Sequence, residues 1–233
     1  MDKKRGGQRK NKVKIKWSRN FAYAIGLLVS DGCLKNDRRH IDFTSKDLQL
    51  VQEFKKALSI KNKIWSKKAT KKDKRIYYRV SFGDKTFYEF LEVVGLSQRK
   101  SKTLTVVKIP NKYFIDFFRG IFDGDGSVYV FWDKRWPNSF GYILTIASAS
   151  NDFLKWLKKK MTKLYGVHGF ICKGKGVYEI RYTKRDTQKI YNGMYHQNKP
   201  LFLKRKYTKL KGILAFDKKN KSCRGSSVAR AEA

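Results

Sequence analysis

Two aspartates, Asp31 and Asp125, stand at the same place in two similar stretches of the sequence. Residues 24–32 read AIGLLVSDG and residues 118–126 read FRGIFDGDG, so each stretch has a glycine, two apolar residues and a closing Asp-Gly pair. A single Asp-Gly pair is a common turn. Two such pairs after the same apolar pattern indicate a duplicated unit in which the two carboxylates hold equivalent positions.

Small residues recur every four positions before each aspartate. Ala22, Gly26 and Ser30 share one face of a helix in the first stretch, as do Gly120 and Gly124 in the second. A stripe of small residues lets two helix backbones approach closely. We therefore expect these two motif helices to pack against each other at the centre of the molecule.

This packing brings Asp31 and Asp125 together at the C-terminal ends of the two helices, where Gly32 and Gly126 are expected to form left-handed caps. The negative end of each helix dipole and the repulsion between the acids both disfavour two ionised carboxylates there. A divalent cation removes both difficulties, and Mg²⁺ prefers oxygen ligands and also binds phosphate oxygens of a substrate. The pair therefore predicts a metal site that hydrolyses phosphodiester bonds.

The elements that must position these acids also recur. After each motif helix the sequence predicts strands, a helix that begins near Ser45 or Ser150 as its N-cap, further strands, and a short helix, the first of which Gly95 closes. The alternating strands are expected at residues 75–82 and 177–183. The pattern predicts an α+β fold of two pseudo-symmetric αββαββα subdomains that pack through the motif helices.

Composition and the repeat together set the expected boundaries. The second subdomain is the longer one, with its extra residues expected around 132–140, next to Pro137. The predicted parts are a basic arm at 1–20, a first subdomain at 21–105, a linker at 106–113, a second subdomain at 114–212, and a C-terminal tail at 213–233. From Lys218 onward the tail turns polar and is expected to lack order.

Charge favours a nucleic-acid partner. The chain has 55 Lys+Arg against 19 Asp+Glu, a formal net charge of +36, which a polyanion neutralises with release of counterions. A membrane is a weaker alternative, because no long apolar run or signal-peptide core is present; we expect an intracellular protein. Cys33, Cys172 and Cys223 lie far apart and only three histidines occur, which argues against structural zinc and for free thiols, with Cys33 and Cys172 expected in packing.

Both Asp-Gly stretches resemble the signature of the LAGLIDADG homing endonucleases, in the single-chain form with two motifs. The resemblance extends from about Phe21 to Leu210. It departs from the signature at Val29, which replaces the first acid, and at Phe118-Arg119, where Arg119 is expected to reach past the helix interface. No intein splicing residues are seen at either end.

The resemblance implies roles for further residues. The carbonyl just before each motif aspartate also binds metal in that family, which corresponds to Ser30 and Gly124 here. A lysine late in each half lines the active-site pocket, and Lys100 and Lys206 resemble it, which adds them to the two aspartates as expected catalytic residues. The implied cofactor is Mg²⁺, with Mn²⁺ substituting and Ca²⁺ binding without supporting cleavage. The implied activity cuts both strands across the minor groove and leaves short 3′ overhangs.

The outward faces of the predicted antiparallel sheets are expected to form a saddle on DNA. Mixed polar types suit base reading, and basic hairpin tips suit phosphate contacts, although an ordinary solvated surface would look similar. The expected base readers are His40, Asp42, Thr44, Arg75, Tyr77, Arg79, Ser81, Glu179, Arg181 and Thr183, and the expected phosphate contacts are Lys67, Lys68, Lys173 and Lys175.

The sequence therefore predicts a metal-dependent endonuclease that acts as a monomer on a long, pseudo-palindromic site in double-stranded DNA. Two alternatives stay open. The same scaffold and charge would serve intron RNA in a splicing cofactor, a maturase, and the same fold without cleavage would serve as a DNA-binding regulator.

Overall fold

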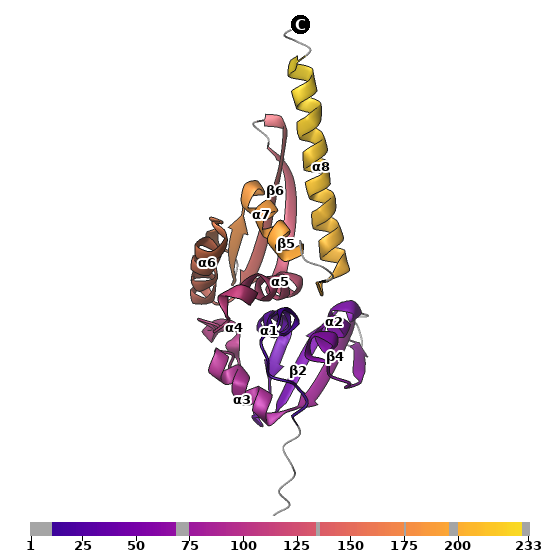
Figure 1. Ribbon diagram of the computed structural model, residues 1–233, viewed down its shortest axis with the longest axis vertical. Helices are drawn as coiled ribbons and strands as arrows, with labels where there is room; N and C mark the ends of the chain where they lie inside the picture. The colour runs from indigo at the N-terminus through magenta and orange to yellow at the C-terminus, as the bar shows by residue number, and fades with distance from the viewer. Residues whose placement is uncertain (1–10, 69–74, 134–135, 175, 196–199, 230–233) are drawn as a thin grey trace, which may run out of the picture.

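The computed structural model describes residues 11–68, 75–133, 136–174, 176–195 and 200–229. Figure 1 shows two α+β halves related by an approximate repeat, with one motif helix from each half at the centre. None of the helices in these ranges is long and apolar enough to cross a membrane.

The two halves repeat the same order of elements. The first consists of α1 (Arg19–Asp31), β1 (Gly32–Leu34), β2 (His40–Ser45), α2 (Leu48–Leu58), β3 (Ile64–Lys68), β4 (Ile76–Gly83), α3 (Lys85–Val94) and α4 (Lys100–Thr103). The second consists of η1 (Asn111–Tyr113), α5 (Phe114–Asp125), β5 (Gly126–Asp133), β6 (Trp136–Ser148), α6 (Asn151–Tyr165), β7 (Phe170–Lys173), β8 (Tyr178–Tyr182), α7 (Lys184–Tyr195) and α8 (Lys204–Ala229). The predicted α+β fold with a duplicated αββαββα unit is confirmed.

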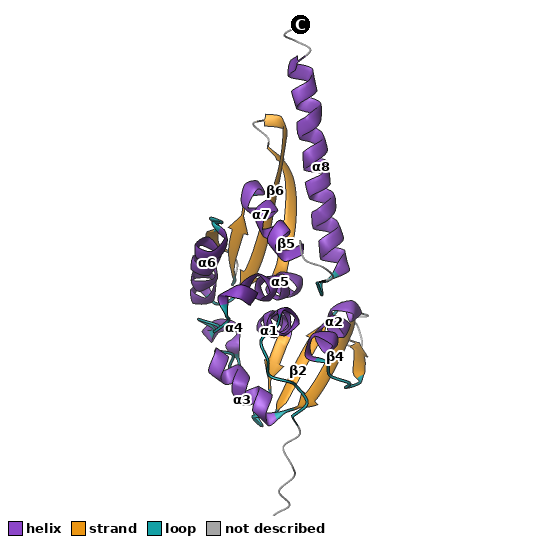
Figure 2. Ribbon diagram, viewed as in Figure 1, coloured by secondary structure: helices purple, strands orange, loops and turns teal. Residues whose placement is uncertain are grey.

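Each half contains one four-stranded antiparallel sheet with the same strand order. The orders are β1-β2-β4-β3 and β5-β6-β8-β7. Figure 2 shows the helices gathered around the strands, with α1 and α5 between the two sheets. Alternate strand residues such as Phe43, Val80 and Ile180 are buried against these helices, which leaves the other face of each sheet open.

The α1–α5 contact is as close as the small residues predict. A Cβ atom added to Gly26 would lie 2.2 Å from the carbonyl oxygen of Phe117 and 3.0 Å from the Cα of Gly120. A Cβ atom on Gly120 would lie 2.2 Å from the carbonyl oxygen of Tyr23. Only glycine permits this approach, because any side chain would force the two helices apart.

The caps of the motif helices differ from the prediction. Gly32 and Gly126 have extended backbones, with φ of −82° and −79°, and are not left-handed. Each glycine leads directly into a strand, so the chain leaves the helix without a left-handed turn. A Cβ atom on either residue would lie 2.5 Å from the carbonyl oxygen of Leu28 or Phe122, so close approach to the last helical turn requires glycine here.

The two predicted serine N-caps have different outcomes. The hydroxyl of Ser150 accepts a hydrogen bond from the backbone N–H of Phe153 and caps α6. In the first half, α2 begins two residues later, with Asp47 as its N-cap, and Ser45 instead accepts from the N–H of Asp47. Ser45 is the last residue of β2, so its pairing within the sheet takes it out of the capping position.

The ends of the second half are more ordered than the sequence indicates. The extra residues lengthen the β5–β6 hairpin, as expected, and α8 runs beside it away from the body of the protein (Figure 1). Residues from Lys218 onward were expected to lack order, but α8 continues to Ala229. Phe216 explains part of this, because its ring packs on Trp132 and Phe140 of the hairpin.

Substitution at the helix crossing tests the close contact. Gly26→Ala or Gly120→Ala should lower the free energy of unfolding by about 3 kcal/mol, because the new methyl group meets a backbone carbonyl that cannot move away. Gly212→Ala is the matched control, since a Cβ atom there meets nothing within 4 Å in α8. Denaturant unfolding should show the control at or above wild-type stability, whereas equal stability of all three variants would contradict the contact.

Candidate functional site

Asp31 and Asp125 end the two packed helices and lie within electrostatic reach of each other. Burial and the negative charge of Asp125 together raise the pKa of Asp31 to about 6, although Lys206 and Lys100 oppose this shift. Burial likewise raises the pKa of Asp125, against Lys206, Lys100 and a hydrogen bond from Ser30. The predicted juxtaposition of the two acids is therefore present in the structure.

The two late lysines reach the same place from opposite halves. Lys206, at the start of α8, donates hydrogen bonds to the carbonyl oxygens of Phe122 at 2.7 Å and Gly124 at 2.8 Å. Lys100 is only 6% exposed and donates to the carbonyl oxygen of Gly32. Burial lowers the pKa of both amines, that of Lys206 to about 8.

The two lysines supply part of the positive charge that the sequence predicted a metal ion would provide. Each ammonium group binds carbonyls at the end of a motif helix, where it offsets the helix dipole, and each also attracts both carboxylates. The carbonyl of Gly124, expected as a metal ligand, accepts a hydrogen bond from Lys206. Ser30 is a neighbour of Asp125 through its hydroxyl.

The donor set still fits a hard divalent cation. Across the described parts of the chain, no group of three or more His, Cys, Asp or Glu side chains forms a complete metal cluster. Two carboxylates alone are nevertheless the usual protein share for Mg²⁺, which takes its other ligands from water and phosphate oxygens. A small cavity of about 70 Å³ beside Asp125, Ser30 and Lys100 leaves room for such ligands.

A buried polar network behind the site was not found from the sequence. One oxygen of Asp123, a fully buried residue, accepts from the hydroxyl of Tyr23 and from the N–H of Leu203, both at 2.8 Å. Arg119 reaches beyond the helix crossing, as expected, and donates to the carbonyl oxygens of Met194 and Leu201. Together these contacts join both motif helices to the segment that leads into Lys206. The sequence signal that could have indicated this network is Asp123, because the first motif has Val29 at the equivalent position.

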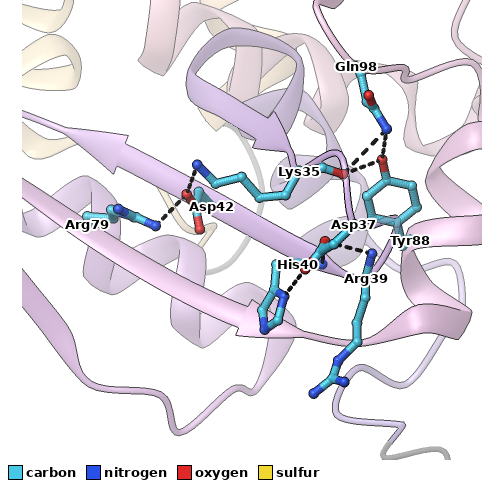
Figure 3. A network of polar contacts seen from close by, with 8 residues as sticks. All are labelled: Lys35, Asp37, Arg39, His40, Asp42, Arg79, Tyr88 and Gln98. Carbon is cyan, nitrogen blue, oxygen red and sulfur yellow. Dashed lines mark hydrogen bonds and ion pairs between the residues drawn. The ribbon is translucent and has the colours of Figure 1, made fainter.

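The open face of the first sheet holds a charged network (Figure 3). Asp42, expected to read bases, is only 4% exposed and lies under Lys35 and Arg79, which form ion pairs with it at 2.9 Å and 2.6 Å. The ring of His40 pairs with Asp37. Arg79 and Lys35 are therefore the groups that this network presents outward.

The other expected DNA contacts lie on or beside the open faces. Thr44, Tyr77, Arg79 and Ser81 share the face of the first sheet by register, and Lys67 and Lys68 are exposed on β3, with Arg75 just before β4. Ile76, the first residue of β4, is exposed. In the second half, Arg181 binds Glu179, while Thr183 and Lys173 are exposed and Lys175 lies outside the described residues.

The two cysteines expected in packing lie on these open faces as free thiols. Cys33 is exposed on β1 opposite Asp42, and Cys172 is half-buried on β7 opposite Glu179. The expectation fails because both residues fall on the outward phase of their strands.

Comparisons with known proteins agree with the duplicated fold. A model described as a LAGLIDADG-like domain matches residues 19–95, and one described as a WhiA LAGLIDADG-like domain matches residues 114–192. A search of curated proteins gave no matching relative.

Solved structures share the fold at low sequence identity. The homing endonuclease I-WcaI bound to its DNA recognition sequence matches with a TM-score of 0.62 and 15% identity, over 84% of this chain and 88% of that one. Full-length WhiA from Thermatoga maritima matches with a TM-score of 0.55 and 15% identity, over 96% and 72%. I-DmoI in complex with DNA and Ca matches with a TM-score of 0.50 and 21% identity, over 77% and 91%.

Two family models thus match the two halves that the repeat and the packed motif helices define, one model to each half. The chain belongs to the LAGLIDADG family, as a single polypeptide with two LAGLIDADG-like domains.

Proposed function

We propose that the protein is a site-specific endonuclease that cuts both strands of a long, pseudo-palindromic DNA site with divalent metal ions. One observation carries the proposal: Asp31 and Asp125 meet at the apposed helix ends, each opposed by Lys100 and Lys206. Two buried acids in electrostatic contact are costly to the fold, and such arrangements concentrate at functional sites. The relatives I-WcaI and I-DmoI, both solved with DNA, support the choice of substrate.

The residues of the site would divide the work. Asp31 and Asp125 would hold Mg²⁺ or Mn²⁺, which supplies Lewis-acid charge at a scissile phosphate and activates water. Lys206 has a pKa lowered to about 8 by burial, so its amine exchanges a proton readily near neutral pH. Lys100, which donates to the carbonyl of Gly32 in its own half, would orient water at the second strand.

The sheets would provide the binding energy and the specificity. Their open faces carry polar side chains that could contact base edges. Exposed lysines such as Lys67 and Lys173 lie near the hairpin ends, where they would contact phosphates. Equal strand order in two unequal sequences suits two similar but different half-sites. Both catalytic aspartates reside in one chain, so a monomer suffices.

A second candidate is a DNA-binding protein that does not cut. It is favoured by the hydrogen bonds of Lys206 to Phe122 and Gly124, which leave the helix ends satisfied without any metal ion. Neither of the two family models that match the chain is described as an endonuclease, which is compatible with this candidate. Intron RNA as the ligand of a maturase stays a third possibility, because phosphate binding by lysines serves both nucleic acids.

Removal of one motif carboxylate separates cutting from binding. Asp31→Asn or Asp125→Asn should abolish Mg²⁺-dependent cleavage of a duplex carrying the target, with DNA affinity changed less than about threefold. Cleavage gels and filter binding measure the two effects, with Glu89→Gln on the exposed side of α3 as the control. Full cleavage by either variant would remove the metal role, and absence of cleavage by the wild type in both Mg²⁺ and Mn²⁺ would favour the non-cutting candidate.

The same substitution should stabilise the metal-free protein. The pKa of Asp31 is raised from 3.8 to about 6, so its contribution to stability is complete below about pH 4 and is lost as pH rises through 6. Asparagine avoids this loss. The free energy of unfolding of Asp31→Asn should therefore exceed that of the wild type by about 1 to 3 kcal/mol at pH 8 in EDTA, and should equal it at pH 4. Thermal midpoints measure the gain, and added Mg²⁺ should raise the midpoint of the wild type but not of the variant. A variant that melts below the wild type at pH 8 would contradict the repulsion.

The role of Lys206 can be tested with an uncharged side chain of similar length. Lys206→Met should slow single-turnover cleavage at least tenfold, because it removes a proton donor and leaves both acids with less opposing charge. Lys209→Met, at an exposed position one turn along α8, is the control. Identical rates for the two variants would place Lys206 outside the reaction and leave it a helix cap.

A further inference from the structure

The open face of the second sheet has an apolar area at β5 and β6, whereas its central strands also carry Thr145, Glu179 and Arg181 there. Three large side chains on it are strongly exposed: Tyr129 at 55%, Phe131 at 45% and Phe170 at 42%. The strand register places Tyr129 opposite Ile143, which is half-buried on the same face. Tyr129, Phe131 and Ile143 lie on the adjacent strands β5 and β6, whereas Phe170 lies on the other edge strand opposite Arg181. A group of exposed apolar side chains on a protein surface usually marks a binding site.

The cation on this face has an internal partner. Arg181 donates two hydrogen bonds to one oxygen of Glu179, at 3.1 Å and 2.9 Å. Among the described strand positions whose side chains point outward from β5 to β8, it is the only lysine or arginine. Its charge is therefore balanced within the sheet, as the charge of Arg79 is balanced by Asp42 on the first sheet, and the large exposed side chains of this face are apolar.

The open face of the first sheet carries more cations. Lys35 and Arg79 stand over the nearly buried Asp42, and Lys67 projects from β3 on the same face by register (Figure 3). The one large exposed ring there, Trp65, lies 4.6 Å from the amine of Lys63. The carboxylate of Asp42 holds the guanidinium of Arg79, so that fork is oriented before any ligand arrives.

The apolar face is continuous with the candidate catalytic site. Ala147 lies on the same outward phase of β6 as Ile143, and it lines the 70 Å³ cavity together with Asp125 and Lys100. Thr145 lies between these two residues on the same phase of β6 and is buried, so a ligand that reaches the two aspartates along the second sheet passes Ala147, Thr145, Ile143 and Tyr129 in turn. This continuity favours the nucleic acid itself, and not a separate protein, as the occupant of the face.

Only one base edge in the major groove is apolar. Thymine carries a methyl group there, whereas guanine presents two acceptors that suit an arginine fork. We propose that the two sheets read their half-sites by different chemistry: the second sheet selects thymines by methyl contact with Tyr129 and Ile143, and the first selects guanine through Arg79. This assignment rests on the proposed function only in that the ligand is duplex DNA.

Replacement of thymine by uracil tests the methyl contact directly. The full-length protein in EDTA, which prevents cutting, first selects bound duplexes from a randomised library. Selected thymines in each half are then changed to uracil one at a time, which removes only the methyl group. Each change in the half-site of the second sheet should weaken binding about fourfold, as expected for one buried methyl group, and changes in the other half should have no effect.

Variants assign the half-sites to the sheets. Tyr129→Ala and Ile143→Ala should abolish the uracil effect, and Arg79→Ala should relax the guanine preference in the opposite half. Val93→Ala, which removes an apolar side chain exposed at 66% on α3, should change neither.

The outcomes separate the two proposals. Failure to select any duplex would overturn the proposed function together with this inference. Selection of a defined site in which uracil binds as well as thymine in both halves, or in which Tyr129→Ala leaves the profile unchanged, would overturn the inference alone and would indicate that the apolar face binds another protein.

Discussion

The structure depends on the contact between α1 and α5 at Gly26 and Gly120. The missing side chains let each helix touch backbone atoms of the other, so the two halves share one core instead of forming separate domains. Because both helices end at an aspartate, the same contact that joins the halves also brings Asp31 and Asp125 together. Packing and function are therefore coupled, and a change that separates the helices would also dismantle the site.

The electrostatics of the site follow from this geometry. Burial and mutual repulsion raise the pKa of Asp31, while the lysines that oppose it have themselves lost solvent, which lowers the pKa of Lys206 to about 8. The pKa of Asp31 is thus raised toward neutral pH and the pKa of Lys206 is lowered toward it, an arrangement typical of sites that exchange protons or bind ions. The lysines make the acid pair tolerable without a metal ion, so the strongest sequence argument for metal becomes weaker, although the carboxylate pair keeps the chemistry that magnesium prefers.

The two halves have diverged within a common fold. The second half carries Asp123 and Arg119, which tie the segment before Lys206 to both motif helices, whereas Val29 occupies the place of Asp123 in the first half. The open sheet faces differ as well: the first carries Lys35, Lys67 and Arg79, and the second carries Tyr129, Phe131 and Ile143 beside Arg181. Divergence of this kind suits an asymmetric ligand, because each half can change its contacts while the helix crossing that both halves need is retained.

The sequence by itself determined the elements and the pair of acids. Small residues recur every four positions in the motif helices, and apolar residues recur every two positions in the strands. Both spacings follow local backbone geometry, so the motif helices, the strand phases and the position of Ser150 as a cap were predictable. Tertiary structure decided what depends on residues far apart in the chain. The extended backbone at Gly32, the bonds from Tyr23 to Asp123 and from Lys206 to Gly124, and the order of α8 beside the hairpin all arise between segments whose approach no local pattern encodes.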